Sequence, residues 1–260
     1  PCYQAYRRGV LLAGGEPHRI PLRPEDDFLV PLDRLPRETV ADSRLLYLNY
    51  PNNPTAATAP RAYLEEAVDF CRSNDLLLVY DHAYSEVAYD GYRPPGVLEV
   101  EGAREVALEF HSFSKTYNMT GWRLGWAAGG REAISVLSRV KTFMDTGVFL
   151  AVQAAGVAAL ESHSDWVPEN VERFHLRRDA AVEALRAGGF EVEAPRATMY
   201  LWVPVPGEES SEGFARRALE DEGVVVLPGS ALGEGGEGFF RIALTVGRDR
   251  LREGARRLGR

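Results

Sequence analysis

Short apolar runs alternate with segments of helical spacing through the first part of the chain. An apolar run at 45–48 ends in turn-forming residues, a helical stripe of apolar residues covers 60–73, and a second apolar run follows at 76–80. Strands that are buried on both faces appear as continuous apolar runs, so this order predicts a parallel sheet covered by helices. The pattern predicts two further strands, at 106–110 and 124–128, on either side of a polar loop.

Helical spacing dominates the sequence from 131 to 188. A charged helix is expected over 168–186, with Gly188 and Gly189 as its C-terminal stop. After it, the pattern changes to strand-like runs at 190–193, 199–203, 224–227 and 239–244, with one helix at 212–222. We therefore predict an α/β protein with two domains: a larger one with a mostly parallel sheet at 1–170, and a smaller α+β domain at 171–260.

The composition is that of an ordinary globular protein of 260 residues, with 45% hydrophobic residues and a formal net charge of −8. A basic face for nucleic acid needs clustered Lys and Arg, so this acidic balance argues against a nucleic-acid binder. No apolar run in the sequence approaches the roughly 20 residues that a membrane-spanning helix needs. The two cysteines, Cys2 and Cys71, are too few for a disulfide framework and lack metal-ligand spacing. We expect a protein of the reducing cytoplasm that holds no metal.

The segment 111–125 carries the most informative chemistry. Lys115 lies between two predicted strands and is a candidate to form a Schiff base, because a lysine in desolvating or cationic surroundings loses its proton more readily. Ser112, Ser114 and Arg123 would offer hydroxyl groups and a forked cation to a phosphate monoester. A surface loop with an ordinary exposed lysine explains the same residues equally well.

Asp81 stands at the carboxyl end of the second predicted strand, where open α/β sheets bind their ligands. A carboxylate in that place keeps a pyridine nitrogen protonated, and Tyr84 is near enough in sequence to donate to an oxygen on the same ring. The simpler alternative is that Asp81 caps the next helix and that Tyr84 packs in the core.

Two other polar residues stand out. Asn53 lies in the proline-fixed segment 49–55 and can offer its amide NH2 to a ring oxygen or a carboxylate, although a simple turn explains the segment too. Arg241 lies within the apolar run 239–244, where an unpaired guanidinium is unfavourable, so we expect it to face a carboxylate. A structural Asp or Glu is slightly favoured over a substrate for this partner.

Together these motifs resemble the pyridoxal-phosphate aminotransferases of class I and II, which have the fold called type I. The resemblance extends through the whole chain, and the motifs stand in family order: 50–55, Asp81 with Tyr84, 112–115 with Arg123, and then Arg241. It implies an α/β/α large domain with a mostly parallel sheet, a smaller C-terminal α+β domain, and pyridoxal 5′-phosphate as the cofactor.

The resemblance also implies a role for each residue. Lys115 would form the Schiff base with the cofactor and move the proton during catalysis, and Asp81 would pair with the ring nitrogen. Tyr84 and Asn53 would contact the ring oxygen. Ser112, Ser114 and Arg123 would hold the cofactor phosphate. Arg241 would bind the substrate α-carboxylate, and Tyr3 would stack on the face of the ring.

Two stretches, 84–95 and 140–149, most resemble the LL-diaminopimelate aminotransferases within this family. This implies a cytoplasmic homodimer in lysine biosynthesis that moves an amino group between an amino acid, with LL-diaminopimelate as the candidate, and a 2-oxo acid. Two alternatives stay open: elimination or decarboxylation with the same cofactor, and effector binding without catalysis. Ala56 stands where the family usually has glycine, which matters only if that position needs a positive φ.

Family members carry a further N-terminal portion ahead of the position of Tyr3. That portion contains a glycine-bearing loop at a helix N-terminus, which helps to bind the cofactor phosphate, and a tyrosine lent across the dimer interface. The resemblance therefore implies that part of the phosphate site lies outside these 260 residues, and we expect weak or absent activity from them alone.

Overall fold

A computed structural model describes residues 1–259, which form two compact units. The central unit comprises Pro31–Pro51 and Thr58–Val171, and the terminal unit comprises Pro1–Val30, Asn52–Ala57 and the residues from Glu172 onward. The compact units thus group the start of the chain and the segment 52–57 with its C-terminal part. The two domains expected at 1–170 and 171–260 stay a prediction.

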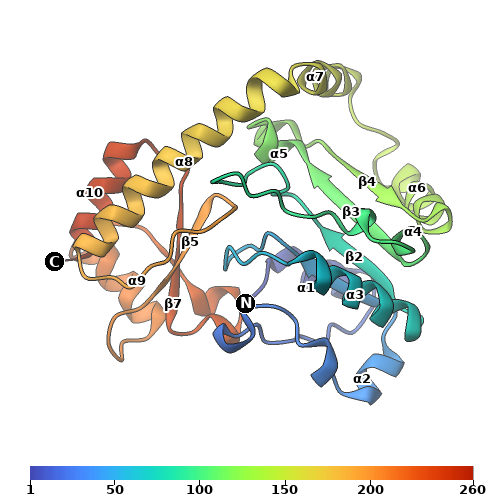
Figure 1. Cartoon of the computed structure of the whole chain (residues 1–260), viewed down its shortest axis with the longest axis horizontal. Helices are drawn as coiled ribbons and strands as arrows, with labels where there is room; N and C mark the ends of the chain where they lie inside the picture. Colours follow the sequence, from blue (N-terminus) through green and yellow to red (C-terminus); the bar gives the residue numbers. More distant parts are fainter. Residues whose placement is uncertain (260) are drawn as a thin grey trace. The chain divides into compact units, whose positions relative to one another are not determined.

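The central unit is built on a four-stranded sheet (Figure 1). Its strands follow the order of the chain: β1 (Leu45–Asn49), β2 (Leu77–Asp81), β3 (Ala107–Ser112) and β4 (Gly125–Gly129). β1, β2 and β3 are parallel to one another, and β4 runs antiparallel to β3. The four predicted strands are confirmed, and the sheet is mostly parallel as expected.

Helix α3 (Arg61–Ser73) shows how the apolar spacing of the sequence produces the helical layer. Its buried residues recur every three or four positions and form one face, namely Tyr63, Leu64, Ala67, Val68 and Cys71. This face packs against β2. The other α-helices of the central unit are α2 (Arg37–Asp42), α4 (Ala103–Val106), α5 (Phe113–Thr116), α6 (Arg131–Asp145) and α7 (Leu150–Glu161).

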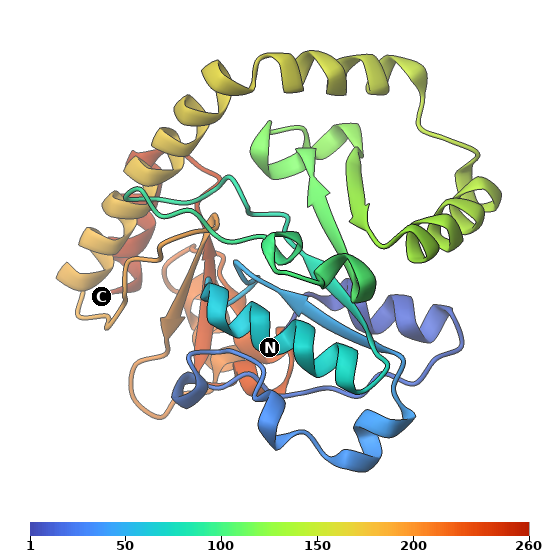
Figure 2. The same cartoon turned by 45° about the vertical axis from the view of Figure 1, so that its right-hand side comes forward.

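Helix α8 (His163–Ala187) begins in the central unit and ends in the terminal unit. It is the long yellow helix in Figure 2. It starts earlier than the predicted first residue at 168. The charged stretch that predicts the helix begins at Pro168, whereas the structure places this proline inside the helix. The predicted end is confirmed: the helix stops before Gly188, and Gly189 has a φ of +87°.

The terminal unit contains a three-stranded antiparallel sheet in the order β5 (Tyr200–Pro204), β7 (Phe239–Ala243), β6 (Leu227–Pro228). Its other helices include α1 (Gln4–Leu12), α9 (Ser211–Glu220) and α10 (Arg248–Leu258). Phe240 of β7 is fully buried, and its ring stacks on that of Phe214 of α9 at a centroid distance of 4.4 Å. Aromatic packing between helix and sheet therefore forms part of the core of this unit.

Two of the expected strand-like runs do not form full strands within residues 1–259. Phe190 and Val192 are buried and their neighbours are exposed, yet 190–193 is not assigned to a strand. In 224–227 only Leu227 joins β6. Alternating burial requires only that one face packs on a core, whereas a strand also needs a neighbouring backbone with which to pair.

Among the described residues, no helix combines the length and the apolar character that crossing a membrane requires.

Candidate functional site

The carboxyl end of β2 fixes Asp81 in the central unit. The side chain of Asn49, at the end of β1, donates a hydrogen bond of 2.8 Å to the Asp81 carbonyl oxygen. The Asp81 carboxylate accepts a bond of 3.2 Å from the backbone N–H of Ala83. The segment after Asp81 is a turn and not a helix, so the alternative that Asp81 caps a helix is wrong. Asp81 instead stands at the strand end where α/β sheets bind ligands.

Lys115 lies on α5, a single helical turn that directly follows β3. Ser112 begins this turn as its N-cap, and its hydroxyl oxygen accepts a hydrogen bond of 3.2 Å from the backbone N–H of Ser114. Burial lowers the pKa of the Lys115 ammonium, the nearby Arg123 lowers it further, and the nearby Asp81 opposes both. Burial and the neighbouring Arg123 thus favour a nucleophilic amine at Lys115, and the charge of Asp81 acts against them.

The predicted phosphate-binding residues lie around this turn. Ser114 is buried, with 6% of its surface exposed, whereas Arg123 is exposed. Arg123 has a left-handed backbone with a φ of 55°, and its Nη1 donates a 2.8 Å bond to the carbonyl oxygen of Thr120. Hydroxyl groups and one guanidinium are therefore available beside the lysine, the donor types that bind phosphate.

Tyr84 is buried in the turn that follows β2, with 4% of its surface exposed. His82, between Asp81 and Tyr84, is also buried, and its Nδ1 lies 2.8 Å from the carbonyl oxygen of Tyr50. Because a carbonyl only accepts, Nδ1 carries the proton in this bond. Burial lowers the pKa of His82, so the ring is a neutral donor that ties the turn to the end of β1.

In the terminal unit, the segment Asn52–Ala57 is a loop that its own hydrogen bonds hold in place. The Asn52 side-chain oxygen accepts hydrogen bonds from the backbone N–H of Thr55 at 3.1 Å and from its hydroxyl at 2.8 Å. The backbone N–H of Asn52 donates to the carbonyl oxygen of Ala57 at 2.8 Å. Ala56 has a φ of 60°, so the position where the family usually has glycine does adopt the left-handed conformation.

Arg241 lies on β7, the middle strand of the terminal unit. Its Nη1 donates a 2.6 Å hydrogen bond to the side-chain oxygen of Asn53, and its guanidinium carbon lies 4.2 Å from the ring centroid of Tyr200. Within residues 1–259, no Asp or Glu forms an ion pair with it. The slightly favoured expectation of a structural carboxylate is therefore wrong, because an amide oxygen and an aromatic face hold the cation instead.

Tyr3 is the N-cap residue of α1 and is 46% exposed. Its ring meets that of Tyr6 edge-on at a centroid distance of 5.7 Å. The predicted site residues thus fall into two groups, each described in its own unit. The central unit holds Asp81, Tyr84, Ser112, Ser114, Lys115 and Arg123, and the terminal unit holds Tyr3, Asn53 and Arg241.

Sequence reasoning missed three asparagines that hold this machinery in place. Asn49 fixes the end of β2, Asn52 organises the loop that carries Asn53, and the Asn170 side chain donates to the carbonyl oxygens of Lys115 and Thr116. A turn rich in Asn and Pro signals the first two, because Asn side chains often bond to nearby backbone. No local pattern marks Asn170, which is far from its partners in sequence.

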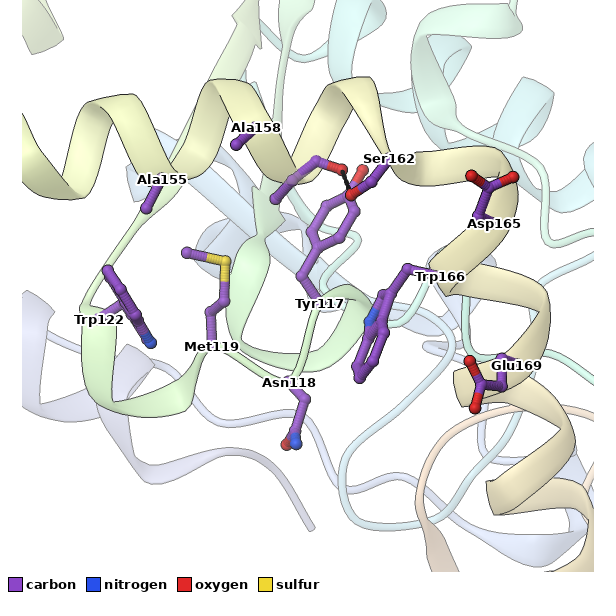
Figure 3. A pocket seen from close by; sticks show the side chains of 11 residues that line it. Tyr117, Asn118, Met119, Trp122, Ala155, Ala158, Ser162, Asp165, Trp166 and Glu169 are labelled. Carbon is purple, nitrogen blue, oxygen red and sulfur yellow. Dashed lines mark hydrogen bonds between the residues drawn. The ribbon is translucent and has the colours of Figure 1, made fainter.

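An open pocket of about 620 Å³ lies beside the segment that follows Lys115. Figure 3 shows Met119 and Trp122 of this segment on one side and Ala155 and Ala158 of α7 on the other. None of the nine predicted site residues lines it. Its full lining is Tyr117, Asn118, Met119, Trp122, Ala155, Ala158, Ala159, Ser162, Asp165, Trp166 and Glu169.

Comparison with known proteins gives one consistent result. The family sequence model described as "Aminotransferase class I and II" matches residues 1–258. The chain is 48% identical to LL-diaminopimelate aminotransferase 2 of Trichormus variabilis and 49% identical to LL-diaminopimelate aminotransferase of Desulforudis audaxviator. Each match covers 99% of this chain and 66% of the relative. The chain therefore spans about two thirds of the length of these relatives.

Solved structures agree with this result. A probable N-succinyldiaminopimelate aminotransferase of Thermus thermophilus is 37% identical with a TM-score of 0.93, over 99% of this chain and 69% of that chain. A mutant of the aspartate aminotransferase of the same organism is 29% identical with a TM-score of 0.91, over 100% of this chain and 71% of that chain. The expected fold, type I of the α/β class, is confirmed.

Proposed function

Because the chain belongs to the family of class I and II aminotransferases, we propose that this protein transfers an amino group between an amino acid and a 2-oxo acid with pyridoxal 5′-phosphate. One observation carries the proposal: Lys115 lies partly buried close to Asp81, and its pKa is lowered. The names of the relatives support LL-diaminopimelate as the amino acid. The proposal includes a place in lysine biosynthesis and, from the family resemblance, a homodimer in the cytoplasm.

The residues present in the central unit fit this cofactor. The amine of Lys115 suits its aldehyde, and the carboxylate of Asp81 suits a protonated ring nitrogen. Ser112 and Arg123 offer a hydroxyl and a guanidinium, the kinds of donor that a phosphate group needs. When bound, the cofactor ring withdraws the electrons that are released as the substrate α-carbon loses its proton.

Lys115 and Asp81 have complementary tasks in the proposed reaction. Lys115 would hold the cofactor through its Nζ, and as an unprotonated amine it would accept and return the proton of the substrate α-carbon. Its lowered pKa favours this task because only the unprotonated amine accepts a proton. Asp81 keeps the ring nitrogen protonated, and its fixed backbone maintains the orientation of the carboxylate.

The other predicted residues bind and orient. Tyr84 and Asn53 would donate to the ring oxygen, Ser114 would add to the phosphate contacts, and Tyr3 would stack on the ring. Arg241 binds the substrate α-carboxylate with two parallel hydrogen bonds. The ring of Tyr200 beneath the guanidinium and the oxygen of Asn53 beside it support this role, because they hold the fork without neutralising its charge.

Covalent trapping tests the proposal, and the sequence simplifies it because Lys115 and Lys141 are the only lysines in the chain. The protein is incubated with pyridoxal 5′-phosphate, reduced with borohydride and digested, and the labelled peptide is identified by mass spectrometry. We expect the label on Lys115, no label in Lys115→Arg, and an unchanged label in the matched control Lys141→Arg. Labelling of Lys141 alone, or of neither lysine, would contradict the proposal.

A second measurement separates amino transfer from the alternative reactions. The loaded protein is given LL-diaminopimelate and a 2-oxo acid, and the new amino acid, ammonia and carbon dioxide are measured together. Amino transfer yields the new amino acid without free ammonia. Release of ammonia or carbon dioxide in its place would indicate elimination or decarboxylation.

A further inference from the structure

Helix α5 raises a question of backbone hydrogen bonding because it is a single turn, Phe113–Thr116. The last carbonyls of any helix lack partners within it, and in so short a helix this applies to every carbonyl. The first two find partners within the segment 113–120, a backbone N–H and the hydroxyl of Thr120. The carbonyls of Lys115 and Thr116 do not, so their partner has to come from elsewhere in the fold.

Asn170 of α8 supplies that partner. Its side-chain nitrogen donates to the carbonyl oxygen of Lys115 at 3.2 Å and to that of Thr116 at 3.1 Å. Asn170 is 5% exposed and Thr116 is 7% exposed, so water has little access to these groups. A single buried amide therefore holds the backbone on which the lysine stands, and apolar residues of the same size lack the donors for this task.

A second contact comes from the same part of α8. The hydroxyl of Tyr117 and Nδ1 of His163 are 2.6 Å apart, and His163 precedes Asn170 by about two turns. Residues two turns apart lie on the same face of a helix. One face of α8 thus contacts the segment 115–117 at two points, and both fall in the part of the helix that belongs to the central unit.

We propose that Asn170 is a positioning residue that fixes the backbone of Lys115, and with it the place of the amine. The catalytic consequence rests on the proposed function, whereas the positioning concerns only residues of this chain. Without the amide donors, α5 loses two of its backbone hydrogen bonds and the lysine gains freedom to turn toward water. The amine then regains solvation of its charged form, which favours the protonated ammonium.

Competitive acetylation of the protein without cofactor tests the positioning directly. Wild type and Asn170→Leu are treated with trace acetic anhydride across a range of pH, and mass spectrometry gives the acetylation of Lys115 relative to the exposed Lys141. In Asn170→Leu we expect the pKa of Lys115 to rise, which lowers its relative reactivity near pH 7.5 about tenfold. Lys141 is the internal reference because it lies on α6, outside these contacts.

Val167→Ala is the matched control, since Val167 is also buried on α8 but bonds to no carbonyl of α5. It is expected to lower the thermal midpoint without changing the Lys115 profile. Asn170→Ser keeps one donor and should give an intermediate profile, and it decides the question if Asn170→Leu does not fold. An unchanged Lys115 profile in the folded Asn170 variants, or an equal shift in Val167→Ala, would overturn the proposal.

The outcome is independent of the proposed function because the acetylation experiment contains no cofactor. If borohydride trapping fails and the acetylation profile still shifts, the aminotransferase proposal is wrong and the positioning stands. If trapping succeeds and the acetylation profile does not shift, the aminotransferase proposal stands and the positioning role of Asn170 is wrong.

Discussion

The two units use different means to hold their functional side chains. In the central unit, Asp81 lies at the end of a parallel strand and Lys115 lies on the turn that follows the next strand, and hydrogen bonds between side chains and the backbone hold both segments. In the terminal unit, Arg241 lies within an antiparallel strand and is held by two side chains, Asn53 and Tyr200. Ends of parallel strands gather polar groups at one edge of a sheet, whereas a residue within a strand depends on its neighbours.

This difference predicts which kinetic constant each unit controls. We expect Asp81→Asn to lower kcat of amino transfer about 100-fold or more, because it removes a charge that stabilises the reaction. We expect Arg241→Leu to raise KM for amino acids and 2-oxo acids about 10-fold to 100-fold with a smaller change in kcat, because the lost bonds act on the bound substrate. Steady-state kinetics measures both.

Arg241→Lys is the control for the second variant. It keeps the positive charge but loses the planar fork, so we expect a KM between those of wild type and Arg241→Leu. Two outcomes would remove the distinction between the units: a kcat effect from Arg241→Leu as large as that from Asp81→Asn, or a pure KM effect from Asp81→Asn.

The turn after Asp81 allows a smaller test, by pH. Burial lowers the pKa of His82 in the folded protein. As the pH falls through about 6.5, the unfolded chain takes up a proton at this histidine that the folded protein does not, so the unfolding free energy falls by at most about 1.4 kcal/mol per pH unit. In His82→Asn, whose amide can still donate to Tyr50, we expect a shallower fall between pH 6.5 and 5.

Denaturant unfolding at several pH values measures this slope. His82→Gln is the control. It also removes the titratable imidazole, but its amide donor lies one bond further from the backbone than that of His82→Asn. A slope in His82→Asn as steep as that of wild type would show that His82 does not set the acid sensitivity of the central unit.

The loop of the terminal unit allows the smallest test. Ala56 has a φ of 60°, a conformation that costs a residue with a Cβ about 1 to 2 kcal/mol. Ala56→Gly relieves this strain but loses a buried methyl group and gains unfolded-state entropy, so we expect a net rise in unfolding free energy of up to about 1 kcal/mol. Ala59→Gly, at a buried position without positive φ, should instead lower it by about 0.5 to 1 kcal/mol.

Thermal unfolding of the two variants against wild type distinguishes them. Opposite signs are expected because only one of the two alanines has a left-handed backbone. A loss of stability in both variants would mean that the Ala56 methyl packs well enough to outweigh its strained backbone.

Much of the central unit, and the loop of the terminal unit that carries Asn53, were predictable because their signals are local. Apolar runs placed all four strands, and the turn chemistry around 49–55 and 111–125 marked the segments that carry Asn53 and Lys115. The failures were of a different kind. The run at 190–193 has the alternation of a strand but is not assigned to one, and Arg241 has an amide and a ring where a carboxylate was expected.

The sequence by itself determined the strands, the order of the motifs and which lysine is the candidate for the Schiff base, because each follows from residues close together in the chain. Only the tertiary structure decided how those residues are held. Asn170 meets Lys115 across 55 positions and Arg241 meets Asn53 across 188. Such pairs form when separate elements pack and bury polar groups that then require partners, and no local pattern records which partner will be near.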